Sequence, residues 1–132
     1  MTLQSLIKNI DQITSVDDLV AIKSCVEDSY AWIKASFDSI PVNQLVTGRA
    51  QFVDALLCHL WHLYGLDNES ELALCAVGGY GRGHLQPYSD IDLLIVSKRT
   101  LKPDTQEKVS RFITLLWDIK LDVGQSVRTI KE

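Results

Sequence analysis

Residues 72–96 carry the sequence LALCAVGGYGRGHLQPYSDIDLLIV. The stretch begins with a short apolar run, 72–77, which is typical of a buried β-strand and ends in Gly78 and Gly79. A second apolar run, 90–96, opens with two aspartates and predicts another strand. Two strands joined by a glycine-rich turn indicate a sheet, and this stretch therefore decides the fold class.

Amphipathic segments on the N-terminal side of these strands predict helices. Apolar residues at steps of three and four mark a helix over about 19–37, with Asp17 as its cap. A second helix is expected over about 46–64, and Gly65 supplies its stop. The first 65 residues are therefore expected to be helical.

The C-terminal side adds one helix and one strand. Pro103 opens a helix that runs to about Trp117, and Trp117 is expected on its inward face. A third strand should follow at about 121–128, interrupted by Gly124. Helices combined with a small sheet give an α/β (α+β) fold.

Composition sets limits on the function. A chain of 132 residues suits one domain, and its net charge of −4 argues against a nucleic-acid partner. The apolar runs are too short to span a membrane, and no signal peptide opens the chain. Cys25, Cys58 and Cys75 are expected to be buried, reduced thiols, in keeping with a cytoplasmic protein.

Asp90 and Asp92 are the first candidates for chemistry. Residues at i and i+2 of a strand share a face, so their α-carbons lie roughly 6–7 Å apart. Two carboxylates at that distance repel one another unless a proton or a cation lies between them, and Mg²⁺ prefers such oxygen ligands. Alone, the pair would more often be a solvated strand end.

The glycine-rich turn changes that balance. Glycines let the backbone approach a phosphate and present its N–H groups to the anion. The turn starts at Gly78 and Gly79 and leads, eleven positions later, to Asp90. No P-loop lysine motif is present, and the glycines do not form a dinucleotide fingerprint. Phosphate donors beside metal ligands predict metal-assisted phosphoryl or nucleotidyl transfer.

The whole pattern resembles a known superfamily. Gly78 and Gly79 followed by the string DIDL at 90–93 are similar to the signature of the DNA polymerase β-like nucleotidyltransferases. The longer strings VGGYGRG and SDIDLL, with LWDI at 116–119 and LDVGQSVRT at 121–129, resemble the N-terminal domain of the bacterial bifunctional uridylyltransferase/uridylyl-removing enzymes. That resemblance covers most of residues 45–130.

The resemblance implies a small mixed sheet flanked by helices. It also implies a third carboxylate on a neighbouring strand. Asp122 is the better match. Asp118 is the rival, but it stands at the end of a helix, where a cap or a solvent-facing position is expected. Asp90, Asp92 and Asp122 would then be the catalytic residues and hold Mg²⁺, as two ions. Asp122 would also favour deprotonation of the acceptor hydroxyl.

The resemblance further implies a triphosphate site and a domain division. Gly78, Gly79 and Ser89 would seat the phosphates, and Arg82 would neutralise charge there or remain a surface arginine. We expect an N-terminal helical segment at 1–45 and a nucleotidyltransferase core at 46–132, the core being the incomplete front part of a longer chain.

The implied function is transfer of UMP from UTP to a tyrosine of the PII nitrogen-regulatory protein. Another protein nucleotidyltransferase, such as glutamine synthetase adenylyltransferase, is the nearest alternative. A fragment that binds nucleotide or partner without turnover is the second. No His-Asp pair occurs in the sequence, so we do not expect the uridylyl-removing activity in these residues. His59 and His62 are expected to be packing or surface residues.

Overall fold

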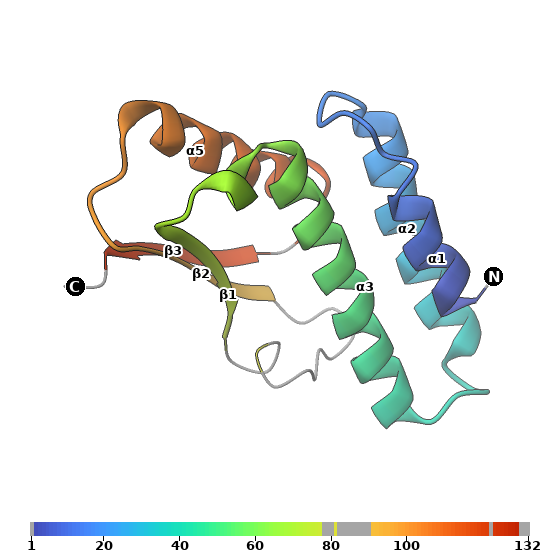
Figure 1. Cartoon of the computed structure of the whole chain (residues 1–132). Helices are drawn as coiled ribbons and strands as arrows, with labels where there is room; N and C mark the ends of the chain where they lie inside the picture. Colours follow the sequence, from blue (N-terminus) through green and yellow to red (C-terminus); the bar gives the residue numbers. More distant parts are fainter. Residues whose placement is uncertain (1, 78–80, 82–90, 122, 130–132) are drawn as a thin grey trace.

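A computed structural model describes residues 2–77, 81, 91–121 and 123–129. Helices α1 to α3 form the N-terminal part, and the strands with helix α5 form the remainder (Figure 1). The elements are α1 (Leu3–Ile10), α2 (Leu19–Ser36), α3 (Val42–Leu63), the 3₁₀ helix η1 (Leu66–Asn68), β1 (Leu72–Ala76), β2 (Ile91–Ser97), α5 (Pro103–Asp118) and β3 (Val123–Thr129). The expected fold class, helices with a small mixed sheet, is confirmed.

The first two helices begin at side-chain caps. The Thr2 hydroxyl accepts a hydrogen bond from the Ser5 N–H, and the Ser5 hydroxyl accepts one from the Thr2 N–H. Helix α2 is capped by Asp18, whose carboxylate accepts from the Ala21 N–H. The expectation that Asp17 is the cap is therefore wrong by one residue, because Asp18 is the position that precedes the first helical turn.

Helix α3 is the central element of the packing. It begins at Val42, one turn earlier than expected, since Pro41 can stand before a first turn whose N–H groups need no intrahelical partner. Eleven of its 22 residues are buried. Trp61 meets Phe112 of α5 edge-to-face at 5.2 Å between ring centroids. One apolar core thus joins the N-terminal helices to the sheet side.

The sheet has the order β1-β2-β3 among the described residues. β1 pairs antiparallel with β2, and β2 pairs parallel with β3, which it reaches through the crossover helix α5. In β2 the residues at 91, 93, 95 and 97 are buried and the alternate ones are half-buried or exposed. Helix α5 lies along one side of the sheet in Figure 1. One face of β2 therefore belongs to the core, and the other does not.

Two expectations about burial are wrong. Trp117 is 55% exposed, and its ring N–H reaches the Val123 carbonyl oxygen at 3.4 Å instead of entering the core. Leu115 is buried in its place. Cys58 is also exposed, although Cys25 is buried as expected, and Cys75 is half-buried. Both errors arise because an apolar sequence neighbourhood does not say which face of a helix a residue occupies.

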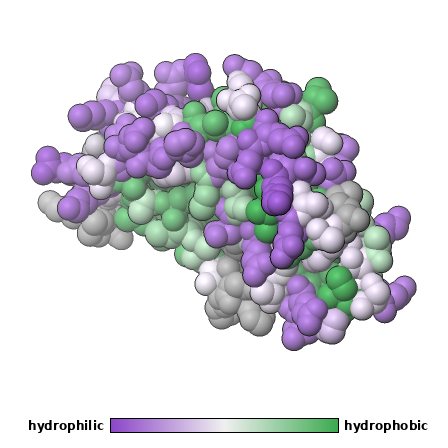
Figure 2. Space-filling view, turned by 45° about the vertical axis from the view of Figure 1, so that its right-hand side comes forward, coloured by the Kyte–Doolittle hydropathy of each residue, from purple (hydrophilic) through white to green (hydrophobic). Residues whose placement is uncertain are grey.

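The face of the molecule shown in Figure 2 is mostly hydrophilic, with a hydrophobic area on its left-hand side. No helix in the described part of the chain is both long and apolar enough to cross a bilayer.

Candidate active site

Asp92 is the one predicted metal ligand that lies within the described residues. It is the second residue of β2, between buried Ile91 and buried Leu93, and its side chain is exposed. No hydrogen bond or ion pair joins its carboxylate to another described residue. An unpaired carboxylate on a strand that otherwise packs into the core keeps its oxygen atoms available to a cation.

The backbone at Asp92 is bonded to the residue that precedes the glycine-rich turn. The Asp92 carbonyl oxygen accepts a hydrogen bond from the Val77 N–H at 3.1 Å, and the Val77 carbonyl oxygen accepts one from the Gly81 N–H at 3.0 Å. The second bond spans four residues, as in a helical turn. Gly81 therefore lies close to Val77, which is itself bonded to the strand that carries Asp92.

Gly81 has a packing reason to be glycine. A β-carbon placed on it would lie 2.7 Å from the Ala76 carbonyl oxygen, closer than real β-carbons come to a backbone atom. Any side chain would push the turn away from the end of β1. The sequence showed the glycine-rich turn, and the structure shows that this glycine permits the close return.

Gly124 is a residue whose importance sequence reasoning missed. The sequence predicts an interruption of the strand at this residue, but β3 continues through it. Gly124 is the register partner of Asp92 in the parallel β2–β3 pair. The available signal was a glycine inside a strand pattern, which often marks a close approach by a ligand or by backbone.

The other predicted site residues lie outside the described part of the chain. They are Gly78, Gly79, Arg82, Ser89, Asp90 and Asp122. Their roles stay predictions. Asp90 precedes Ile91 and Asp122 precedes Val123 in the sequence, and Ile91 and Val123 are register partners.

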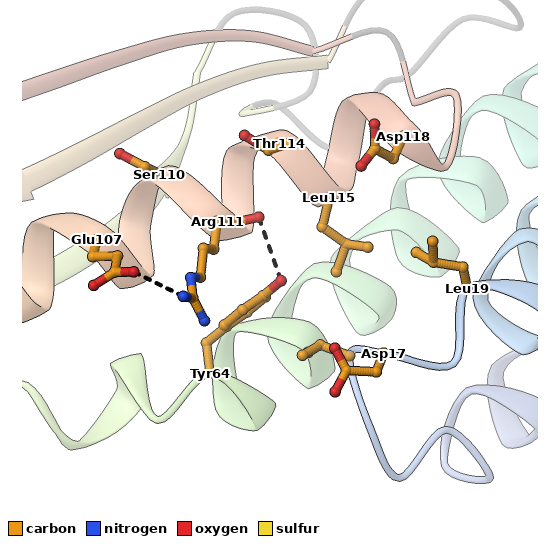
Figure 3. A pocket seen from close by; sticks show the side chains of 10 residues that line it. Asp17, Leu19, Tyr64, Glu107, Ser110, Arg111, Thr114, Leu115 and Asp118 are labelled. Carbon is orange, nitrogen blue, oxygen red and sulfur yellow. Dashed lines mark hydrogen bonds and ion pairs between the residues drawn. The ribbon is translucent and has the colours of Figure 1, made fainter.

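Asp118, the rival third carboxylate, lies elsewhere. It is the last residue of α5 and lines a pocket of about 410 Å³ whose lining contains no strand residue (Figure 3). In this pocket Arg111 already pairs with Glu107 at 2.8 Å, and the Tyr64 hydroxyl donates to the Arg111 carbonyl oxygen at 3.3 Å. Burial, followed by the nearby Asp17 carboxylate, raises the pKa of Tyr64. The pocket is thus separate from the strand that carries Asp92.

The two histidines of α3 have different partners. A ring nitrogen of His59 lies 2.6 Å from the Ile13 carbonyl oxygen, and His62 pairs with Asp67. Both positions agree with the expectation of packing or surface residues. Within the described ranges, no group of three or more His, Cys, Asp or Glu side chains could hold a metal ion.

The matches between this chain and known proteins agree on one family. A family model described as "Nucleotidyltransferase domain" matches residues 65–132. The "Bifunctional uridylyltransferase/uridylyl-removing enzyme" of Pseudoalteromonas translucida is 42% identical over 100% of this chain and 15% of its own length. The proteins of the same name from Vibrio atlanticus and Vibrio cholerae are 50% and 51% identical over 87% and 73% of this chain.

This chain spans 11–15% of the length of these three relatives. No solved structure matches it. The family model covers more than half of the chain, from residue 65 to residue 132, and it includes β1, β2, α5 and β3. On this match, with the mixed sheet and the exposed aspartate on β2, the chain belongs to the nucleotidyltransferase domain family.

Proposed function

We propose that this chain contributes the catalytic site of a metal-dependent nucleotidyltransferase that moves UMP from UTP to a tyrosine of a PII-type protein. The observation that carries the proposal is Asp92. Its carboxylate is exposed and unpaired among the described residues, on a strand bonded to Val77, the residue just before the glycine-rich turn. A solvated strand end can also carry an exposed aspartate, and the nearby glycine-rich sequence is what favours a metal site here.

Asp90, Asp92 and Asp122 would hold Mg²⁺, as two ions. The register supports this set, because the residues that follow Asp90 and Asp122 pair with one another. Asp118 is the weaker choice, since it lines a pocket without strand residues. Bound Mg²⁺ supplies charge neutralisation for the triphosphate and the leaving group, so no covalent nucleophile from the protein is needed.

Gly78, Gly79 and Ser89 would seat the triphosphate, and Arg82 would neutralise its charge. Support comes from Gly81, a neighbour in the sequence, which lies tightly against the end of β1, next to the strand of Asp92. Asp122 would also favour loss of the proton from the acceptor hydroxyl. The roles follow the chemistry of the residue types: backbone N–H groups and an arginine for phosphate, carboxylates for the cation.

The proposed donor follows from the names of the relatives and not from the residues of the site. The relatives are named for uridylyl transfer, which favours UTP, whereas a glycine turn and aspartates do not distinguish uracil from adenine. The PII acceptor, a cytoplasmic location and the division into 1–45 and 46–132 are part of the same proposal. A glutamine synthetase adenylyltransferase and a nucleotide-binding fragment without turnover are the alternatives.

The test is calorimetry of UTP, ATP, CTP and GTP binding with and without Mg²⁺. We expect selective, Mg²⁺-dependent binding of UTP, which Asp92→Asn abolishes while the melting temperature stays nearly unchanged. Asp118→Asn is the matched control, because it removes the same charge at the pocket on α5. Equal binding by wild type and Asp92→Asn would overturn the proposed site, and a preference for ATP would favour the adenylyltransferase.

A further inference from the structure

Gly124 lies directly beside Asp92. The two residues are register partners in parallel strands, so their side-chain positions point to the same face of the sheet. A β-carbon placed on Gly124 would lie 3.2 Å from Asp92 Oδ1. Apart from its own chain neighbours, that oxygen is the only described atom within 4 Å of the position. The missing side chain therefore leaves space next to one specific carboxylate oxygen.

Backbone conformation does not explain this glycine. Among the described glycines only Gly65 has a positive φ, so Gly124 has a backbone that other residues adopt. A glycine inside a strand weakens it, because the residue loses more conformational freedom on folding than any other. Gly124 thus has a cost in the strand and no conformational reason for it.

Packing of the core does not explain it either. At Gly48 of α3, a β-carbon would meet the Trp32 ring at 2.8 Å, which is a contact between two helices. Gly124 is exposed instead, and no described core residue lies against it. What a side chain at position 124 would crowd is the carboxylate and the space in front of it.

We propose that Gly124 is a positioning residue for the metal–triphosphate site. Its missing side chain leaves Asp92 free to turn an oxygen toward a divalent cation, and it leaves room beside that oxygen for the water or phosphate that completes the cation's shell. The inference rests on the proposed function, in which Asp92 is a metal ligand. It adds that the neighbouring strand, through the absence of a side chain, sets how well that ligand works.

The experiment measures Mn²⁺ binding by electron paramagnetic resonance, together with the melting temperature, for wild type and Gly124→Ala. We expect Gly124→Ala to weaken Mn²⁺ binding by about 10- to 100-fold, the range for residues that orient metal ligands. Ser126→Thr is the matched control. It adds one methyl group to the same strand and the same face, beside Leu94 instead of Asp92, and should leave Mn²⁺ binding unchanged.

Repeating the Gly124→Ala substitution in a protein that already carries Asp92→Ala separates crowding of the Asp92 carboxylate from damage to the fold. If the added methyl group crowds the Asp92 carboxylate, Gly124→Ala lowers the melting temperature only when Asp92 is present. When Asp92 is already alanine, only the gain from replacing a strand glycine remains. The same loss of melting temperature in both backgrounds would overturn the inference. So would Gly124→Ala binding Mn²⁺ as wild type does.

The same measurements distinguish a failure of the proposed function from a failure of the inference about Gly124. If Asp92→Asn binds Mn²⁺ as well as wild type, Asp92 is not a ligand, and both the site and the role of Gly124 are wrong. If Asp92→Asn loses binding and Gly124→Ala retains it, the proposed site stands and only the inference about Gly124 fails.

Discussion

Helix α3 and the two outer strands of the sheet represent two kinds of region in this molecule. Half of α3 is buried, eleven of 22 residues, including Leu56 and Leu60 with no exposed surface. In β1 and β3, none of the residues whose side chains the structure describes is buried. Apolar burial is the dominant stabilising term in folding, so the helices hold the fold together. The two outer strands have far less of that support, and β2, which carries Asp92, lies between them.

The difference shows why the candidate site is where it is. Asp92 can keep a carboxylate that no other described residue pairs with, because its face of β2 does not enter the core. A charge placed on the opposite face, beside Ile91 or Leu93, would be buried at a high cost. The proposed function therefore depends on the incomplete covering of the sheet, and stability depends on the complete packing of α3.

The largest expected effect comes from a truncation in α3. Leu56→Ala should lower the free energy of unfolding by about 2–5 kcal/mol, because the lost side chain is fully buried and leaves a cavity. Leu74→Ala in half-buried β1 is the matched control and should cost clearly less. Denaturant unfolding of both variants measures the two losses. Equal losses would mean that the strands contribute to the core as much as α3 does.

A smaller effect is expected at the junction of the two regions. Gly81→Ala should cost about 1–3 kcal/mol, because the new β-carbon has to displace the Ala76 carbonyl group. At Gly65 the problem is the positive φ of 74° and not space, and asparagine tolerates that conformation. Thermal unfolding should therefore show Gly65→Asn to be milder than Gly81→Asn. The reverse order would remove the argument that the turn packs against β1.

The smallest effect concerns the exposed pair of His62 and Asp67, which joins the end of α3 to η1. The hydrogen bond with His62 lowers the pKa of Asp67 below its usual value of 3.8. A carboxyl whose pKa is lowered by folding adds stability above its unfolded pKa and loses it as the pH falls through the folded pKa. Asp67→Asn should thus reduce the melting temperature slightly at neutral pH and less in acid.

Melting curves of wild type and Asp67→Asn, recorded from neutral pH down into acid, check whether the difference in melting temperature shrinks as the pH falls. A difference that stays constant into acid would show that the charge of Asp67 contributes nothing. The effect is small because both side chains are well exposed, at 67% for His62 and 39% for Asp67, and water screens the pair.

Several elements follow from local sequence alone. The apolar runs at 72–77 and 90–96 predicted β1 and β2, and Pro103 marked the first turn of α5 correctly. These features depend on backbone preferences and on periodicity within a few residues, which any chain of this sequence carries. The pattern of glycines and aspartates likewise indicated the nucleotidyltransferase family, which the family model confirms.

Other features were decided only by the tertiary structure. The parallel pairing of β2 with β3 makes Gly124 the neighbour of Asp92, although 31 positions separate them in the sequence. The exposure of Trp117 and the contact of His59 with Ile13 depend in the same way on which helix packs against which face. A sequence determines the faces of each element through its local period, but the partner of each face is chosen by packing among distant segments.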